Sequence, residues 1–361
     1  MGGCDIYCAI CGSTFSSTQF ISIDSDDEGD NTYDGEVIGD SDIKWLDNLR
    51  ALGINSNVTG ERKSFLTGDG IHNDTDIILA YPGEDPNVPY ERGLKELCYF
   101  YAYMDISGDQ EEEPVIPFHK LCFEEIFLRC FKDESLNGDI LHALCMELVN
   151  RVPNMLLLYY GEPTPPCEQF WECKKGEELL VTNPVDIPQL KGYLDELRPT
   201  TDQTGSSPAA DVQETSDIFS RLPRELRHHL FGLLPIASVL ALKAASWSMH
   251  STDVPETSWK KRLQTELGWL WELHDVDLFK SQKLEARLSA VVAELEAKSR
   301  YNREKVDYIP GLANRRRIWM VCEDIKDLYR DKVAESEGRV LDSSSALAVC
   351  RVNISGGGIE E

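Results

Sequence analysis

The sequence predicts a mainly α-helical protein with an α+β N-terminal domain, followed by a three-helix unit and an antiparallel helical hairpin. Three observations support this prediction. The 361 residues, of which 42% are hydrophobic, suffice for two buried cores. The stretch at 199–216 (PTTDQTGSSPAADVQETS) has no hydrophobic periodicity and is typical of a linker. The charge changes at the same place, because residues 1–216 contain 41 acidic and 14 basic residues, whereas residues 217–361 contain 22 of each.

The N-terminal domain, residues 1–198, combines helical and strand patterns. An acidic segment at 24–39 is too polar to pack and indicates a loop or a disordered segment. The apolar spacing at 40–52 predicts a capped helix, and that at 139–149 predicts a second core helix. The apolar run at 77–81 predicts a short buried strand, so we expect few strands in this domain.

The N-terminal domain also carries a candidate metal site. Cys8 and Cys11, followed by Gly12, have the spacing of a zinc knuckle, in which two thiolates hold one ion and the glycine permits a tight turn. A zinc site needs a second pair of ligands. His119 and Cys122 lie one turn apart in a segment predicted to be helical, which places both side chains on one face. We therefore predict a structural zinc ion held by these four residues.

The alternative is that these thiols only pack in the core. More than a hundred residues separate the two pairs, and Cys122 and Cys130 can be buried apolar thiols on a core helix. A catalytic role is not indicated, because four Cys and His ligands leave no open coordination position. The sequence also contains no phosphate-binding loop, no Gly-x-Ser-x-Gly and no His-Glu-x-x-His. We predict a protein that is not an enzyme.

Three helices are predicted within 217–263. Pro223 is suited to the first turn of a helix, Pro235 ends that helix, and Pro255 begins the third. Helices this short cannot bury all their leucines among themselves, so an apolar face should remain for a partner. The apolar residues at helical spacing are Leu222, Leu226, Leu230 and Leu233, then Val239, Leu242 and Ala245, then Trp259, Leu263 and Leu267.

This segment resembles the F-box family. The Leu-Pro-x-Glu-Leu motif at 222–226 is followed by a leucine-rich helix and by the closing pair Trp259-Lys260. The resemblance covers about forty-five of the 361 residues. With the cysteine-rich start, the linker and an Arg-Arg-Arg run at 315–317, the layout is loosely similar to F-box proteins of filamentous fungi.

The resemblance implies a substrate-recognition adaptor of an SCF-type (Skp-cullin-F-box) ubiquitin ligase. The implied partners are a Skp-type subunit with its cullin core and an unknown protein substrate. The alternative is a zinc-stabilised interaction or scaffold protein whose F-box acts in a complex without cullin. The residues expected to bind the Skp-type subunit are Leu222, Pro223, Leu226, Leu230, Leu233, Leu242 and Trp259.

The C-terminal helical region, residues 264–350, is predicted to form the hairpin. Apolar stripes at 284–295 and 318–328, joined near Pro310, would face each other in antiparallel helices. The arginine run at 315–317 can meet an acidic partner, the N-terminal half included, or remain a solvated basic turn. Residues 351–361 are predicted to be a disordered tail.

Charge and cysteine usage limit the partners and the compartment. The strongly acidic N-terminal half argues against nucleic acid as a partner. No signal peptide and no apolar run near the length of a membrane span is evident, so we expect no membrane partner. Eleven cysteines without a secretory segment indicate reduced thiols, and we expect a cytoplasmic or nuclear location.

Overall fold

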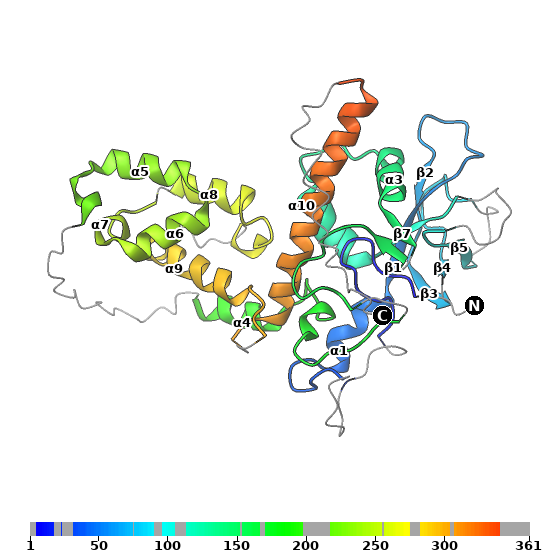
Figure 1. The fold of residues 1–361 in the computed structure, drawn as a ribbon, viewed down its shortest axis with the longest axis horizontal. Helices are drawn as coiled ribbons and strands as arrows, with labels where there is room; N and C mark the ends of the chain where they lie inside the picture. Colours follow the sequence, from blue (N-terminus) through cyan, green and yellow to red (C-terminus); the bar gives the residue numbers. More distant parts are fainter. Residues whose placement is uncertain are drawn as a thin grey trace, which may run out of the picture. The chain divides into compact units, whose positions relative to one another are not determined.

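The chain forms two compact units (Figure 1). Unit 1 comprises Met1–Asp186 with Ala313–Glu361, and unit 2 comprises Ile187–Leu312. The predicted linker at 199–216 and the predicted tail at 351–361 lie outside the described residues. The computed structural model describes residues 5–17, 23, 32–74, 76–89, 96–104, 113–151, 154–166, 170–197, 217–254, 256–274, 282–303 and 307–339.

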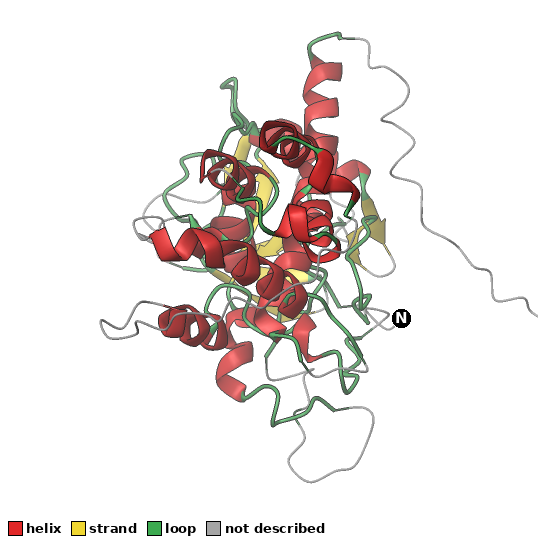
Figure 2. Cartoon of the chain, turned by 90° about the vertical axis from the view of Figure 1, so that its left-hand side faces the viewer, coloured by secondary structure: helices red, strands yellow, loops and turns green. Residues whose placement is uncertain are grey.

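Unit 1 is built around a six-stranded antiparallel sheet (strands yellow in Figure 2). The strand order is β2-β1-β3-β4-β5, and β6 pairs with β1. The expected fold class, mainly α with few strands, is therefore wrong. The strands are β1 (Leu49–Ile54), β2 (Ser64–Leu66), β3 (Gly70–Asp74), β4 (Ile77–Ala80), β5 (Cys98–Tyr101) and β6 (Ile116–His119).

The error begins at the helix expected over 40–52. The helical part ends at Asp47, and the next residues form β1, whose Leu49, Ala51 and Leu52 are all buried. Leu49 and Leu52 are three residues apart, which fits a helix equally well in sequence. Pairing of β1 with three other strands overrides that spacing, because strand preference depends on neighbours more than on the segment itself.

Short helices complete unit 1 around the sheet. Asn137 caps α3, because its side-chain oxygen accepts hydrogen bonds from the amides of Asp139 (2.9 Å) and Ile140 (3.4 Å). The strand expected at 77–81 is β4, and the helix expected at 139–149 is α3. The remaining elements are α1 (Asp40–Ile43), η1 (Lys44–Asp47), the π-helix η2 (Cys122–Phe127), α2 (Leu128–Cys130), α3 (Gly138–Glu147), β7 (Val149–Arg151), β8 (Asn154–Leu156) and η3 (Glu178–Leu180).

The long helix α10 (Pro310–Ser336) belongs to unit 1 from Ala313 onward, whereas α9 (Gln282–Lys298) belongs to unit 2. The predicted hairpin of these two helices is therefore wrong. On α10, Ile318, Val321 and Ile325 are buried. The apolar spacing on α10 predicts that one side of the helix is buried, but it does not predict which part of the protein packs against that side.

Hydrogen bonds and aromatic contacts fasten α10 within unit 1. The Tyr329 hydroxyl accepts a hydrogen bond from the Asn137 amide at 2.7 Å and donates one to the Ser135 carbonyl at 3.1 Å. Its ring meets that of Phe131 at 5.7 Å. Phe131 ends a series of stacked rings that starts on β6 and follows the next helical segment: Phe118, Phe123, Phe127 and Phe131, with centroids 4.4, 5.4 and 4.2 Å apart.

In the described residues of unit 2, all regular secondary structure is helical. The segment at 217–263 contains four α-helices and a 3-10 helix, so the expected three-helix F-box architecture is also corrected. Ser246 accounts for the extra helix, because its hydroxyl accepts a hydrogen bond from the Met249 amide at 3.1 Å and starts α7 after α6 has ended. The helices are α4 (Pro188–Leu197), η4 (Ile218–Arg221), α5 (Arg224–Leu233), α6 (Ile236–Ala245), α7 (Trp247–His250), α8 (Glu256–Thr265), η5 (Trp271–Leu273) and α9.

Polar contacts hold these helices together. The Asp217 carboxylate accepts hydrogen bonds from the Ser246 hydroxyl (2.7 Å) and the Ser248 amide (2.8 Å), which joins η4 to α7. The Glu266 carboxylate accepts one from the first amide of α6 at 2.6 Å and also pairs with Arg262. Pro255, predicted to begin the third helix, lies outside the described residues. Among the described helices, none has the length and apolar character that a membrane crossing requires.

Candidate metal centre

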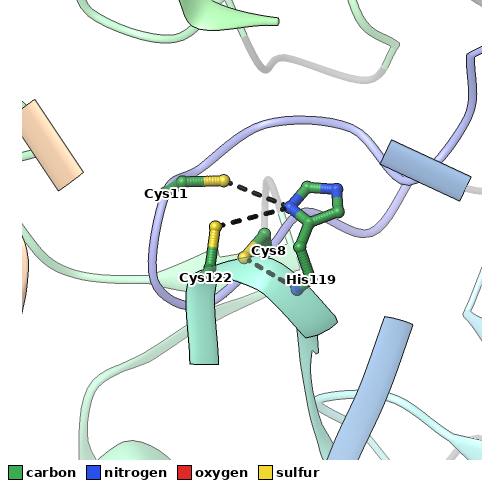
Figure 3. A group of neighbouring side chains, drawn as sticks. All are labelled: Cys8, Cys11, His119 and Cys122. Carbon is green, nitrogen blue, oxygen red and sulfur yellow. Dashed lines mark hydrogen bonds between the residues drawn. The ribbon is translucent and has the colours of Figure 1, made fainter. Parts of the chain in front are cut away.

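Unit 1 brings together the four residues that the sequence singles out as metal ligands. The ligand atoms of Cys8, Cys11, His119 and Cys122 all lie within 4.8 Å of one another, and the four residues are buried (Figure 3). Two come from a turn near the N-terminus and two from the junction of β6 with η2. The cluster can hold a metal ion.

The N-terminal turn presents the first two thiols. The Cys8 amide donates to the Ser13 carbonyl at 3.0 Å, and the Gly12 amide donates to the Cys8 carbonyl at 2.8 Å. Gly12 has φ of +72°, a conformation that glycine adopts without strain. The Ala9 amide donates to the Pro117 carbonyl at 3.0 Å, which attaches the turn to β6. This backbone contact closes the long sequence gap between the two pairs of ligands.

The second pair differs from the expected helical geometry. His119 ends β6, opposite Leu49 of β1, and helical structure begins at Lys120, whose amide donates to the Asn48 carbonyl at 3.0 Å. Cys122 is the first residue of η2. The sheet therefore fixes the histidine and the helix fixes the cysteine, although their sequence spacing is that of one helical turn.

The His119 ring is oriented by its surroundings. Its Nε2 lies 3.0 Å from the Thr14 carbonyl oxygen, so this nitrogen carries the proton and donates. The other nitrogen, Nδ1, faces the sulfurs of Cys11 at 3.3 Å and Cys122 at 4.0 Å. The ring centroids of Phe15 and Trp45 each lie 4.6 Å from the centroid of the imidazole. Such an outer hydrogen bond is the usual arrangement that leaves the other nitrogen of a histidine for a metal.

Backbone amides point at two of the sulfurs. The His119 amide donates to Cys8 Sγ at 3.3 Å, and the Ser13 amide donates to Cys11 Sγ at 3.4 Å. Hydrogen bonds of this kind stabilise thiolates, the form in which cysteine binds metals. The donor set is thus prepared for a cation.

Burial and mutual contacts shift the pKa values of Cys11, His119 and Cys122. Burial acts to raise the pKa of the Cys11 thiol, but hydrogen bonds with Cys122 and Cys8 and the charge of His119 hold that pKa well below its usual value. Burial acts to lower the pKa of His119, whereas the negative charges of Cys11 and Cys8 raise it to about 10. Burial raises the pKa of Cys122 well above that of an ordinary thiol. The site favours a thiolate at Cys11 with a positive charge beside it, which a metal cation satisfies.

Two arginines of the 315–317 run are buried in unit 1 rather than solvated. Arg315 donates to the Pro184 carbonyl at 2.7 Å and the Val185 carbonyl at 3.0 Å. Arg317 donates to the Cys11 carbonyl at 2.7 Å, directly behind a metal-ligand candidate. The sequence offered only an uninterrupted basic run on an otherwise amphipathic helix as a signal for this role.

The residues expected to bind a Skp-type subunit differ in exposure. Leu226 and Leu233 on α5 are 50% and 68% exposed, and Pro223 is exposed. Trp259 is only 2% exposed and belongs to the core of unit 2. The remaining three, which are partly exposed, are Leu222, Leu230 and Leu242. In unit 2, Ile218 and Trp247 are also exposed, although they were not among the residues expected to bind.

Comparison of the chain with protein-family models, with curated proteins and with solved structures returned no match.

Proposed function

We propose that the chain is a non-catalytic binding protein whose helical unit docks on a Skp-type subunit of a cullin ubiquitin ligase and whose other parts select the substrate. The observation that carries the proposal is the apolar face of α5. Leu226, Leu230 and Leu233 recur at steps of four and three, which places them on one side of the helix. The Skp-type identity of the partner rests on the F-box resemblance of 217–263.

The two sides of α5 have different environments. Phe231 is fully buried, and its carbonyl accepts a hydrogen bond from the Arg262 side chain of α8. Leu226 and Leu233 instead leave much of their apolar surface in water. Burying a leucine side chain contributes about 1.5–3 kcal/mol. A partner that covers the exposed leucines of α5 would therefore gain burial free energy that folding of unit 2 does not provide. The helix is thus anchored on one side and available on the other.

The proposal is tested by co-purification with a recombinant Skp-type protein and a cullin. The double variant Leu226→Asp, Leu233→Asp keeps the buried side of α5 and places charge on the exposed side. If each of the two leucines contributes about 2 kcal/mol to binding, each substitution weakens binding to the Skp-type protein by roughly 30-fold. Leu128→Asp is the matched control, because Leu128 is a similarly exposed leucine in unit 1. Unchanged capture by the double variant would refute the docking face.

The same reconstitution distinguishes the alternative function. A scaffold that acts without ligase would capture the Skp-type protein but leave cullin unbound. An adaptor brings both into one complex, with the cullin appearing only when the Skp-type protein is present. Capture of neither protein would reject both versions of the function.

We also propose that the metal of unit 1 is a structural zinc ion. Tetrahedral zinc with three thiolates and one imidazole places sulfur atoms about 3.8 Å apart and sulfur about 3.6 Å from nitrogen. The distances from His119 Nδ1 to Cys11 and Cys122, 3.3 and 4.0 Å, lie on either side of the latter value. Four protein ligands leave no position for a substrate or a reactive water, which supports a structural rather than catalytic role.

Metal analysis of the purified chain tests the zinc proposal. We expect one zinc per chain, lost in Cys11→Ser and retained in Cys145→Ser, since Cys145 is a buried free thiol outside the cluster. Absence of zinc from the unmodified chain, after reconstitution under reducing conditions, would refute the proposal. Equal loss in both serine variants would indicate general unfolding rather than loss of a ligand.

A further inference from the structure

Arg317 of α10 places a buried cation beside the metal-ligand turn. Arg317 is only 4% exposed. Nη1 donates to the carbonyl oxygens of Cys11 at 2.7 Å and Tyr160 at 2.9 Å. Nη2 and Nε donate to Asn314 Oδ1 at 2.9 and 3.3 Å. These hydrogen bonds of the guanidinium therefore go to neutral acceptors only.

A buried guanidinium also needs compensation of its charge. Among the described residues, no carboxylate lies within ion-pair distance of Arg317, whereas Arg330 on the same helix pairs with Glu134. Removing an unpaired charge from water is costly, and neutral hydrogen bonds recover only part of that cost. Burial lowers the pKa of Arg317, whereas negative charge on Cys11, Cys122, Cys8 or Tyr160 acts to raise it.

The charge of a loaded metal centre matches this requirement. A divalent ion with three thiolates and one neutral imidazole carries a net charge of −1, because three negative ligands exceed the charge of the ion by one. An Arg side chain remains protonated in proteins, so it supplies +1 at any ordinary pH. Together the centre and Arg317 are neutral in a region that excludes water.

We propose that Arg317 is the counter-cation of the metal centre and that metal binding and the packing of α10 in unit 1 stabilise each other. This inference rests on the proposed zinc site and adds a positioning residue to it. The coupling is reciprocal by necessity: if the metal stabilises the packed helix, the packed helix raises the affinity for the metal by the same factor.

The surroundings of Arg317 are built for close contact with the ligand turn. Gly161, with φ of +83°, passes so near that a Cβ there would lie 2.7 Å from Arg317 Cγ. The Tyr160 hydroxyl donates to the Ala9 carbonyl in the ligand turn at 3.1 Å, while its own carbonyl accepts from Arg317. Asn314 is held in turn by its amide, which donates to the Thr182 carbonyl at 2.8 Å. The arginine, the turn and α10 thus share one hydrogen-bond network.

The inference is tested first by zinc affinity, measured by competition with a chromogenic chelator on the full chain. Arg317→Met removes the charge and keeps much of the volume, whereas Arg317→Lys keeps the charge with fewer donors. Loss of an outer partner of a metal site typically costs 10–100-fold in affinity, and we expect about that loss for the methionine variant. We expect a smaller loss for the lysine variant. Arg330→Met is the control, because Arg330 lies on the same helix and pairs with Glu134 at the surface.

Three outcomes would overturn the inference. Unchanged affinity in Arg317→Met would show that the charge plays no part, and equal losses in the methionine and lysine variants would assign the effect to hydrogen bonding alone. If Arg317→Met does not fold, hydrogen exchange of the unmodified chain provides the test. We expect the α10 amides at 317–330 to exchange faster when a chelator removes zinc. Unaltered exchange would refute the coupling between the metal and α10. If the unmodified chain binds no zinc, the metal proposal itself fails. If it binds zinc with an affinity that does not depend on Arg317, only the present inference fails.

Discussion

Gly12 offers a sharp test of how the ligand turn is built. With φ of +72°, an alanine at this position costs about 1–2 kcal/mol in backbone strain. A Cβ there would also lie 3.1 Å from side-chain atoms of Pro165 and Tyr160, and crowding of this kind in a packed core adds about 1–3 kcal/mol. We expect Gly12→Ala to destabilise unit 1 by about 2–5 kcal/mol and to weaken metal binding, because the turn carries Cys8 and Cys11.

Gly176 provides the matched control. Its φ is +90°, but nothing lies within 4 Å of a Cβ at this position. Gly176→Ala therefore has only the backbone strain, about 1–2 kcal/mol, and leaves the ligand turn untouched. Denaturant-dependent hydrogen exchange of the β1 and β6 amides measures the stability of unit 1 specifically. Equal destabilisation and equal metal affinity in the two alanine variants would refute the account of the turn.

Three further predictions follow from individual side chains. Hydrogen bonds to Asp217 lower its pKa to about 2. The carboxylate therefore stabilises unit 2 above the ordinary aspartate pKa near 4, and this stabilisation is lost as the pH falls toward 2. Thermal melts at several pH values should show the loss in the unmodified chain but not in Asp217→Asn. Zinc affinity should fall between pH 8 and pH 6, because the ion must displace the proton of His119, whose pKa is about 10; a flat profile in chelator competition would contradict this. Tyr329→Phe should cost unit 1 about 1–2 kcal/mol in urea unfolding, since the Asn137 amide loses its acceptor, and an unchanged midpoint would count against that bond.

The metal-ligand candidates could be predicted because their chemistry is local. A Cys-x2-Cys-Gly turn and a His-x2-Cys pair each present two donors within a few residues, whatever surrounds them. That the two pairs meet depends on long-range contacts, such as the Ala9 amide on the Pro117 carbonyl, which have no counterpart in the spacing. The site was therefore predictable as two halves, and the fold joins them.

The sheet and the place of α10 were harder to predict for the same physical reason. Leu49 and Leu52 suit a helix by spacing, and pairing with three other strands determines the strand instead. The stripe of Ile318, Val321 and Ile325 predicts a buried face but not the surface that covers it. For Arg317 the sequence left open an acidic partner or solvent, because a charged side chain is normally expected in one or the other. Its carbonyl acceptors at Cys11 and Tyr160 lie beside the metal-ligand turn and have no signal in the sequence.

The ligand set itself is the central claim, and X-ray absorption at the zinc edge tests it most directly. The reconstituted full chain should show three sulfur neighbours at about 2.3 Å and one nitrogen neighbour at about 2.0–2.1 Å, the signature of Cys8, Cys11, Cys122 and His119. A first shell of four sulfurs, or one of oxygen and nitrogen alone, would contradict the proposed metal centre.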